Sequence, residues 1–178
     1  MRKIFTLSCL LGFLVSFSVE AAERDIPSVI APASPTWKGP LPSTVFQLGV
    51  SAGMGFVVDD VGGTLQGRAS FRIVEEGFIP DVSDQVFLEG LFGYMRIPNF
   101  NSLQYGVHLR WDFHATPDWT VFAIGGLGGS IVLYNARNTL WILRPRFGIG
   151  VFYHLIRNAR LRADLASDFI TLGVDFAI

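Results

Sequence analysis

The segment Leu103–Phe113 decides the fold, and it reads Leu103-Gln104-Tyr105-Gly106-Val107-His108-Leu109-Arg110-Trp111-Asp112-Phe113. Large apolar side chains occupy its odd positions, and glycine or polar side chains occupy its even positions. This period of two is typical of a β-strand, whereas a helix repeats every 3.6 residues. One face of this strand therefore meets an apolar environment and the other face a polar one.

The same alternation continues from Thr44 to the end of the chain. The further blocks are 46–56, 65–73, 86–94, 119–131, 144–153, 161–165 and 170–178. Turn-forming pairs such as Pro80-Asp81, Pro98-Asn99 and Pro117-Asp118 separate them. The block 119–131 is so rich in glycine that its facing stays open. We therefore predict an all-β fold: an eight-stranded antiparallel up-and-down barrel over residues 45–178.

The composition excludes several classes of protein. Of the 178 residues 50% are hydrophobic and only 16% are charged, against about 25% in soluble domains. The chain holds a single cysteine, Cys9, and its formal net charge is −1. A disordered chain, a disulfide-stapled module and a basic nucleic-acid binder are therefore excluded, so we expect no nucleic-acid partner.

The first 44 residues precede the barrel as two segments. Arg2 and Lys3 followed by the uncharged run 4–19 are typical of a signal peptide, which we expect to be cleaved after Ala21. Residues 22–44 hold five of the nine prolines, which disfavours regular structure. We interpret them as a flexible periplasmic segment of no fixed fold.

The direction of the apolar face separates a soluble barrel from a membrane barrel. After residue 21 the chain has one lysine, Lys38, against eleven arginines, which favours enclosed ion pairs over a solvated surface. The polar face is rich in glycine, as a cramped interior requires. Aromatic residues lie near strand ends, like an interfacial girdle: Phe46, Tyr94, Trp111, Phe113, Trp119 and Tyr153. The apolar face should therefore contact lipid, which for an exported protein indicates the cell outer membrane.

These features resemble the small eight-stranded outer-membrane barrels, the OmpA transmembrane domain and OmpX among them. The resemblance covers residues 45–178 and includes the turn Thr116-Pro117-Asp118-Trp119. In such families the last strand ends in an aromatic residue that the assembly machinery reads. Here Ile178 stands in that place, with Phe176 two residues earlier on the same face. The resemblance implies that Phe176 and Ile178 form the assembly signal, and that the barrel-assembly machinery is a partner.

An eight-stranded barrel is just wide enough to be filled by its own side chains. The polar faces predict a charge network in the lumen. Its members are Arg68, Arg72, Glu89, His108, Arg110, Asp112, Arg144, Arg146, Arg160, Arg162, Asp164 and Asp175. Enclosed charges must pair, so we interpret this set as a structural plug, with Glu89 between Arg72 on one side and His108 and Arg110 on the other. The excess of three basic residues leaves a narrow anion path as the alternative.

Two kinds of active site are alternatives to this plug. Some eight-stranded barrels also resemble outer-membrane hydrolases that trim lipid A, which is the alternative function. The resemblance implies a histidine with a serine two residues later, but Ile156 follows His154 at that spacing. His108, Asp112 and His114 share a face, yet about 13 Å separates His108 from Asp112. We therefore expect no enzyme activity, no metal and no cofactor.

The predicted function is a structural or interaction role in the cell envelope, with a non-conducting lumen. With both termini in the periplasm, the outward connections 58–63, 96–102, 133–138 and 166–168 are short, which disfavours an adhesion role. The expected partners are outer-membrane lipid and lipopolysaccharide, and the barrel is expected to be a monomer.

Overall fold

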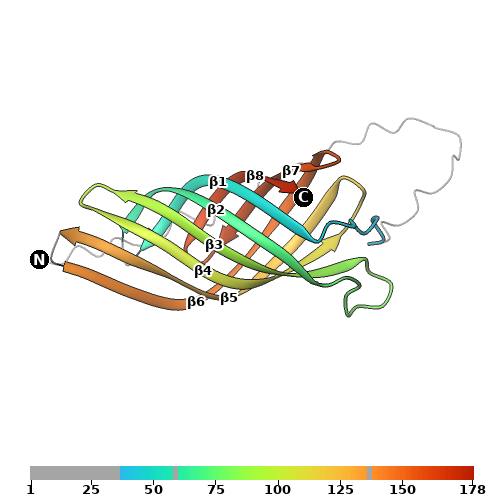
Figure 1. The fold of residues 1–178 in the computed structure, drawn as a ribbon, viewed down its shortest axis with the longest axis horizontal. Helices are drawn as coiled ribbons and strands as arrows, with labels where there is room; N and C mark the ends of the chain where they lie inside the picture. Colours follow the sequence, from blue (N-terminus) through green and yellow to red (C-terminus); the bar gives the residue numbers. More distant parts are fainter. Residues whose placement is uncertain (1–36, 58–59, 136–137) are drawn as a thin grey trace, which may run out of the picture. The chain divides into compact units, whose positions relative to one another are not determined.

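The computed structural model describes residues 37–57, 60–135 and 138–178, and the predicted signal peptide lies outside them. Eight strands form a single closed sheet (Figure 1). They are β1 (Phe46–Val57), β2 (Asp60–Val74), β3 (Asp84–Ile97), β4 (Phe100–His114), β5 (Trp119–Asn135), β6 (Asn138–Ile156), β7 (Ala159–Ala166) and β8 (Phe169–Ala177). Each strand pairs antiparallel with the next, and β8 closes the barrel on β1. The predicted fold class is therefore confirmed.

The two ends of the barrel differ. We call proximal the end that carries residues 37–45, the loop 75–83 and Ile178, and distal the opposite end. The hairpin of β5 and β6 projects at the distal end beyond β7 and β8 (Figure 1). β5 and β6 have 17 and 19 residues, whereas β7 and β8 have only 8 and 9.

The distal connections are shorter than the sequence predicts. β2 begins at Asp60, inside the predicted connection 58–63, and only Pro98-Asn99 separates β3 from β4. Gly62 and Gly63 hide the alternation at the start of β2, but the ladder continues through them to Val57 opposite Asp60. Backbone pairing therefore extends beyond the side-chain pattern that predicts it.

The barrel is apolar outside and polar inside. Leu65, Phe92 and Leu172 are 62%, 62% and 70% exposed, whereas Gln66 and Arg162 on the alternate positions are 2% and 1% exposed. The glycine-rich β5 follows the same rule of alternation, with Val121 and Leu127 outside and Thr120 inside. Among the described residues, no helix has the length and hydropathy to cross a membrane.

Two apolar clusters also lie inside the barrel. One sits at the distal end and consists of Val57, Met95, Ile97, Phe100 and Val132. The other consists of Leu91, Phe122, Ile124, Phe152 and Phe169. The polar face of the strands is therefore interrupted by large rings and aliphatic side chains, which fill the lumen between the charged groups.

Aromatic residues form a rim at each end of the outer surface. At the proximal end, Trp111 packs on Phe78 and Phe113, with ring centroids 6.0 and 5.1 Å away, and Trp119 packs on Tyr153 at 4.8 Å. Toward the distal end, the rim consists of Tyr94, Tyr105 and Trp141. The Tyr105 and Trp141 centroids are 6.4 Å apart, and Tyr94 donates from its hydroxyl to Asn101 Oδ1 at 2.7 Å.

The described end of the proline-rich segment, residues 37–44, contacts the proximal end of the barrel. Gly39 N donates to His114 O at 3.0 Å, and Ser83 N donates to Trp37 O at 2.7 Å. Pro42 O accepts hydrogen bonds from Arg72 Nη1 and Gln85 Nε2, at 2.8 and 3.1 Å. These residues have no regular secondary structure, and they lie against the mouth of the lumen.

Candidate functional site

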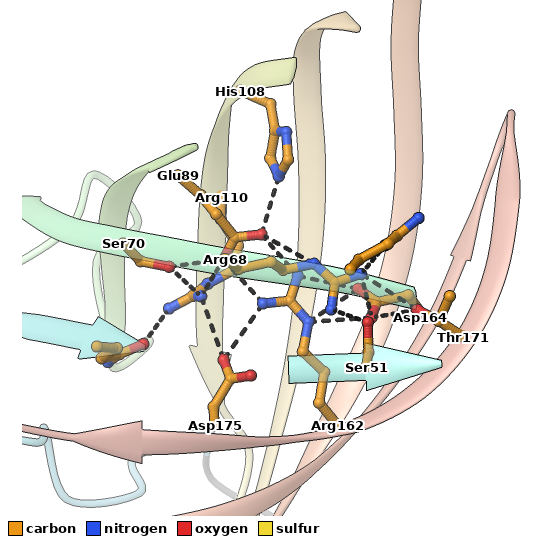
Figure 2. A network of polar contacts seen from close by, with 12 residues as sticks. Ser51, Arg68, Ser70, Glu89, His108, Arg110, Arg162, Asp164, Thr171 and Asp175 are labelled. Atoms are coloured by element: carbon orange, nitrogen blue, oxygen red, sulfur yellow. Dashed lines mark hydrogen bonds and ion pairs between the residues drawn. The ribbon is translucent and has the colours of Figure 1, made fainter. Parts of the chain in front are cut away.

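The buried charges of the lumen converge on Glu89 in the middle of β3. Its carboxylate is fully buried and accepts hydrogen bonds from four side chains (Figure 2). Arg162 donates to both oxygens at 2.7 and 2.8 Å, and Arg110 donates to Oε2 at 2.5 Å. Ser70 Oγ donates to Oε2 at 2.7 Å, and His108 Nε2 lies 2.9 Å from Oε1. Because the donors come from β2, β4 and β7, this one carboxylate ties together strands on opposite walls of the barrel.

Arg162 is the second centre of the network. Besides Glu89 it contacts Asp164, at 2.9 Å from Nη2, and Asp175, at 3.3 Å from Nη1. Asp164 also lies 3.2 Å from Arg68 Nη2. Each of these arginines therefore faces more than one carboxylate, the arrangement that offsets the cost of burying charge.

Arg110 and Arg160 extend the network toward the proximal mouth. Arg110 forms a two-point contact with Asp112, at 2.7 Å from Nε to Oδ1 and 3.1 Å from Nη2 to Oδ2. Arg160 hydrogen-bonds Gln47 Oε1 and lies 3.8 Å from Asp175. Both arginines also donate to the same amide oxygen of Gln47.

Aromatic rings separate and cover the guanidinium groups. Arg110 lies over Phe87 at 4.5 Å and over Phe152 at 5.0 Å, and Arg162 lies over Phe122 at 4.8 Å. Such cation–π contacts stabilise a guanidinium that has lost its water. The sequence pattern did not predict these inward rings, because it assigned large apolar side chains to the outer face.

A second, smaller charge cluster lies nearer the distal end. Arg146 forms a two-point contact with Asp168, with its closest distance of 2.6 Å from Nη2 to Oδ2, and Arg144 approaches the same oxygen at 3.6 Å. Phe169 lies between this cluster and the Glu89 network, since its ring contacts Arg146 at 5.3 Å and Arg68 at 5.4 Å. Asp168 is fully buried, although its position in a turn between strands gave no signal of this.

Glycines make room for Arg146. A Cβ at Gly128 would lie 2.6 Å from Arg146 Nε and Nη2, and one at Gly106 would also overlap the guanidinium. This agrees with the interpretation of the glycine-rich polar face as a crowded interior.

The predicted pairing of Glu89 with Arg72 is wrong. The β2–β3 register places Ser70 opposite Glu89, and it shifts between Arg72 and Val74. Arg72 lies at the proximal mouth and pairs with Glu75 at 3.2 Å. Glu89 does contact two arginines closely, but the second is Arg162 from across the lumen.

The structure also lowers the predicted excess of positive charge. The sequence assigned seven arginines and four acids to the lumen, an excess of three. Asp168 is a fifth buried acid and pairs with Arg146, so the same seven arginines face five acids and the excess falls to two. Most of the buried positive charge is therefore paired within the barrel.

The three histidines lie in two separate places. His108 is bonded to Glu89, whereas His114 and His154 both lie next to Thr120, at 3.0 and 3.4 Å from its Oγ1. Among the described residues, no group of three or more His, Cys, Asp or Glu side chains is placed to hold a metal ion.

Comparison with known proteins shows similarity of fold. The N-terminal β-barrel domain of Pseudomonas aeruginosa OprF is similar with a TM-score of 0.53 and 15% identity, over 74% of this chain and 97% of that chain. A de novo designed transmembrane β-barrel is similar with a TM-score of 0.50 and 19% identity, over 79% and 100%. Ail of Yersinia pestis gives a TM-score of 0.49 at 13% identity, over 76% and 97%. Neither a protein-family model nor a curated protein matches the chain.

The similarity to the OprF barrel domain and to the designed barrel agrees with the resemblance of the sequence to small outer-membrane barrels. The chain has the fold of the small eight-stranded transmembrane barrels, such as the barrel domain of OprF.

Proposed function

We propose that the protein is an integral outer-membrane β-barrel with a non-conducting lumen, which serves a structural or interaction role in the envelope. The outer surface supports insertion in a membrane. On β4, outward apolar residues run from Leu103 to Phe113, ten steps or about 34 Å along the strand. At a tilt of about 40° this gives a band about 26 Å tall, close to the apolar band of membrane barrels. Aromatic rims on both sides of the band fit the two interfaces of a bilayer.

The proposal that the lumen does not conduct rests on the side chains that fill it. Glu89, Arg110 and Arg162 meet at its middle with distances of 2.5–2.8 Å and no exposed surface on their side chains. Distal to them, Met95, Ile97 and Val132 belong to a buried apolar cluster. An ion that crossed the barrel would have to break the ion pairs and then pass hydrocarbon, so the plug is favoured over an anion path.

The geometry gives less support to a lipid A hydrolase. Such an enzyme would act from the lipid-facing wall, but His154 lies beside Thr120, which is on the inward face of β5. Ile156, which stands in the serine position, is 68% exposed and carries no nucleophile. We therefore assign no enzyme activity to the protein.

The proposal includes its location and partners. The outward band would contact outer-membrane lipid and lipopolysaccharide, with the proximal end in the periplasm and a single chain as the working unit. Phe176 and Ile178 are 49% and 71% exposed on the outer face of the last strand, where the barrel-assembly machinery could read them. Exported through a cleaved signal peptide, the chain would end in the cell outer membrane.

Two measurements test this function. After membrane fractionation, the protein should be in the outer-membrane fraction and should migrate differently on a gel before and after boiling, as closed barrels do. Recovery in the soluble periplasm would contradict the membrane assignment. Refolded protein in planar bilayers should give no unitary conductance. Steady, anion-selective steps would instead show that the lumen is a path.

A further inference from the structure

A polar cavity of about 180 Å³ lies at the proximal end, between residues 40–44 and the ends of β4, β6 and β7. Its polar side chains include Gln47, His114, His154, Arg157, Asn158 and Arg160. Two arginines and two histidines thus face one small volume, and no Asp or Glu is among the described residues that line it. The lining therefore offers several charged or polar hydrogen-bond donors, and the carboxylate that pairs with Arg160, Asp175, is not part of it.

His114 is a second, independent feature of this cavity. The side chain is 2% exposed, and its Nε2 is buried without a hydrogen-bond partner among the described residues. Its Nδ1 lies 3.0 Å from Thr120 Oγ1, and His154 Nε2 lies 3.4 Å from the same oxygen. If His154 donates to the hydroxyl and the hydroxyl donates to His114 Nδ1, then Nε2 of neutral His114 carries the proton. A buried N–H in a roomy polar cavity is stabilised by an acceptor.

Arg160 is positioned beside this group by its neighbours. It lies opposite His154 in the β6–β7 register and is 7% exposed. Its guanidinium stacks on Phe152 at 3.5 Å, which fixes its plane. The closest carboxylate that pairs with Arg160, Asp175, is 3.8 Å away, and Arg162 holds the same oxygen more closely at 3.3 Å. Arg160 is therefore less fully neutralised than the arginines of the Glu89 network.

We propose that this cavity binds a phosphate group, with Arg160, Arg157 and His114 as the donors. The donors come from β4, β7 and the β6–β7 turn, so they approach from several directions, as the oxygens of a tetrahedral anion require. Arginine is well suited to phosphate, because its planar guanidinium donates through two N–H groups at once. The cavity also exceeds the ~10–15 Å³ that one water molecule needs, so it has room for a larger ion.

The phosphate could belong to a soluble molecule or to a phospholipid headgroup. Leu41 and Ile156 give the rim an apolar side, and Ile156 is exposed on the outer surface. An acyl chain could leave the cavity there, which would suit a lipid of the inner leaflet. This second source depends on the membrane location proposed above, whereas binding of free phosphate does not.

The chain allows a test with an internal control, because it has only three histidines. The refolded protein is prepared in a detergent that contains no phosphate. Inorganic phosphate is added in one titration and short-chain phosphatidylglycerol in another, while imidazole ring signals are followed by NMR. The signals of His114 and His154 should shift with saturation, whereas those of His108, bonded to Glu89, should not.

Two substitutions and a titration with acetate test whether the cavity binds phosphate specifically. Arg157→Gln, in an exposed turn, should weaken phosphate binding about tenfold, the effect of losing one charge-assisted hydrogen bond. Arg96→Gln, an exposed arginine at the distal end, should leave it unchanged. Saturation by phosphate alone assigns a soluble ligand, and saturation by the lipid alone assigns a headgroup. No shift with either probe, equal affinity for acetate, or equal effects of the two substitutions would overturn the proposal.

Discussion

Replacing Glu89 by glutamine tests whether the lumen network stabilises the barrel. Glutamine keeps the size of the side chain but removes its charge and turns one acceptor oxygen into a donor amide. Four donors now point at the carboxylate, those of Ser70, His108, Arg110 and Arg162. In the variant some of these donors must face an N–H group, and two buried arginines lose a shared counter-charge.

The size of the effect follows from the remaining contacts. Removing one partner of a buried ion pair costs about 3–5 kcal/mol. Arg110 keeps Asp112 at 2.7 Å, and Arg162 keeps Asp164 at 2.9 Å, so the loss should be near the lower limit, about 3 kcal/mol. With a denaturant dependence of about 2 kcal/mol per molar urea, the midpoint should fall by about 1.5 M.

Urea unfolding in lipid vesicles, followed by tryptophan fluorescence and by heat-modifiable migration, measures this shift. The matched control is Glu76→Gln, the same chemical change in the exposed part of the loop 75–83. A double variant with Arg162→Gln should lose less than the sum of its two single losses, since the two residues form one contact. Equal midpoints for Glu89→Gln and Glu76→Gln would refute the stabilising role of the network.

Two further substitutions examine the outer face and the crowded interior. Phe176→Asp should lower the amount of protein in the outer membrane, because it places charge on the lipid face of the last strand, while Ile178→Phe should leave that amount equal or higher. Immunoblots of membrane fractions measure both, and a normal level of the Phe176→Asp protein would argue against the assembly signal. Gly128→Ala should destabilise the barrel by about 1–3 kcal/mol, because its methyl group overlaps Arg146. Gly125→Ala, whose methyl group meets nothing within 4 Å, should be neutral in the same urea assay, and similar losses at both sites would contradict the packing argument.

The sequence predicts the strands and their facing because alternation and charge are local properties. Arg110 marks an inward position in Leu103–Phe113, and Arg162 does the same in β7, so that a period of two then assigns the face of each residue in these strands. β5 lacks such a marker, since its inward positions hold Phe122, Ile124 and glycines in place of charges. Its facing becomes clear only from pairing, which places Asp112 opposite Phe122 on the same side of the sheet.

Contacts across the lumen could not be predicted in the same way. Arg162 reaches Glu89 from β7, 73 residues along the chain, and no neighbouring-strand argument joins β3 to β7. Such a contact depends on the diameter of the closed barrel and on the stagger of its strands. All eight strand pairs together determine both. Asp168 was missed for a different reason: it lies in a turn, where alternation no longer indicates the direction of a side chain.

The two ends of the lumen differ in chemistry, and this difference links the network to the proposed phosphate site. A buried apolar cluster lies at the distal end of the lumen, and a cavity with charged and polar side chains lies at the proximal end. Asp175 stands between the network and this cavity, since one of its oxygens contacts both Arg160 and Arg162. A phosphate beside Arg160 would replace Asp175 as its counter-charge and leave that carboxylate to Arg162. Because such a ligand binds only the folded barrel, phosphate should also raise the urea midpoint, and Arg157→Gln should reduce that increase.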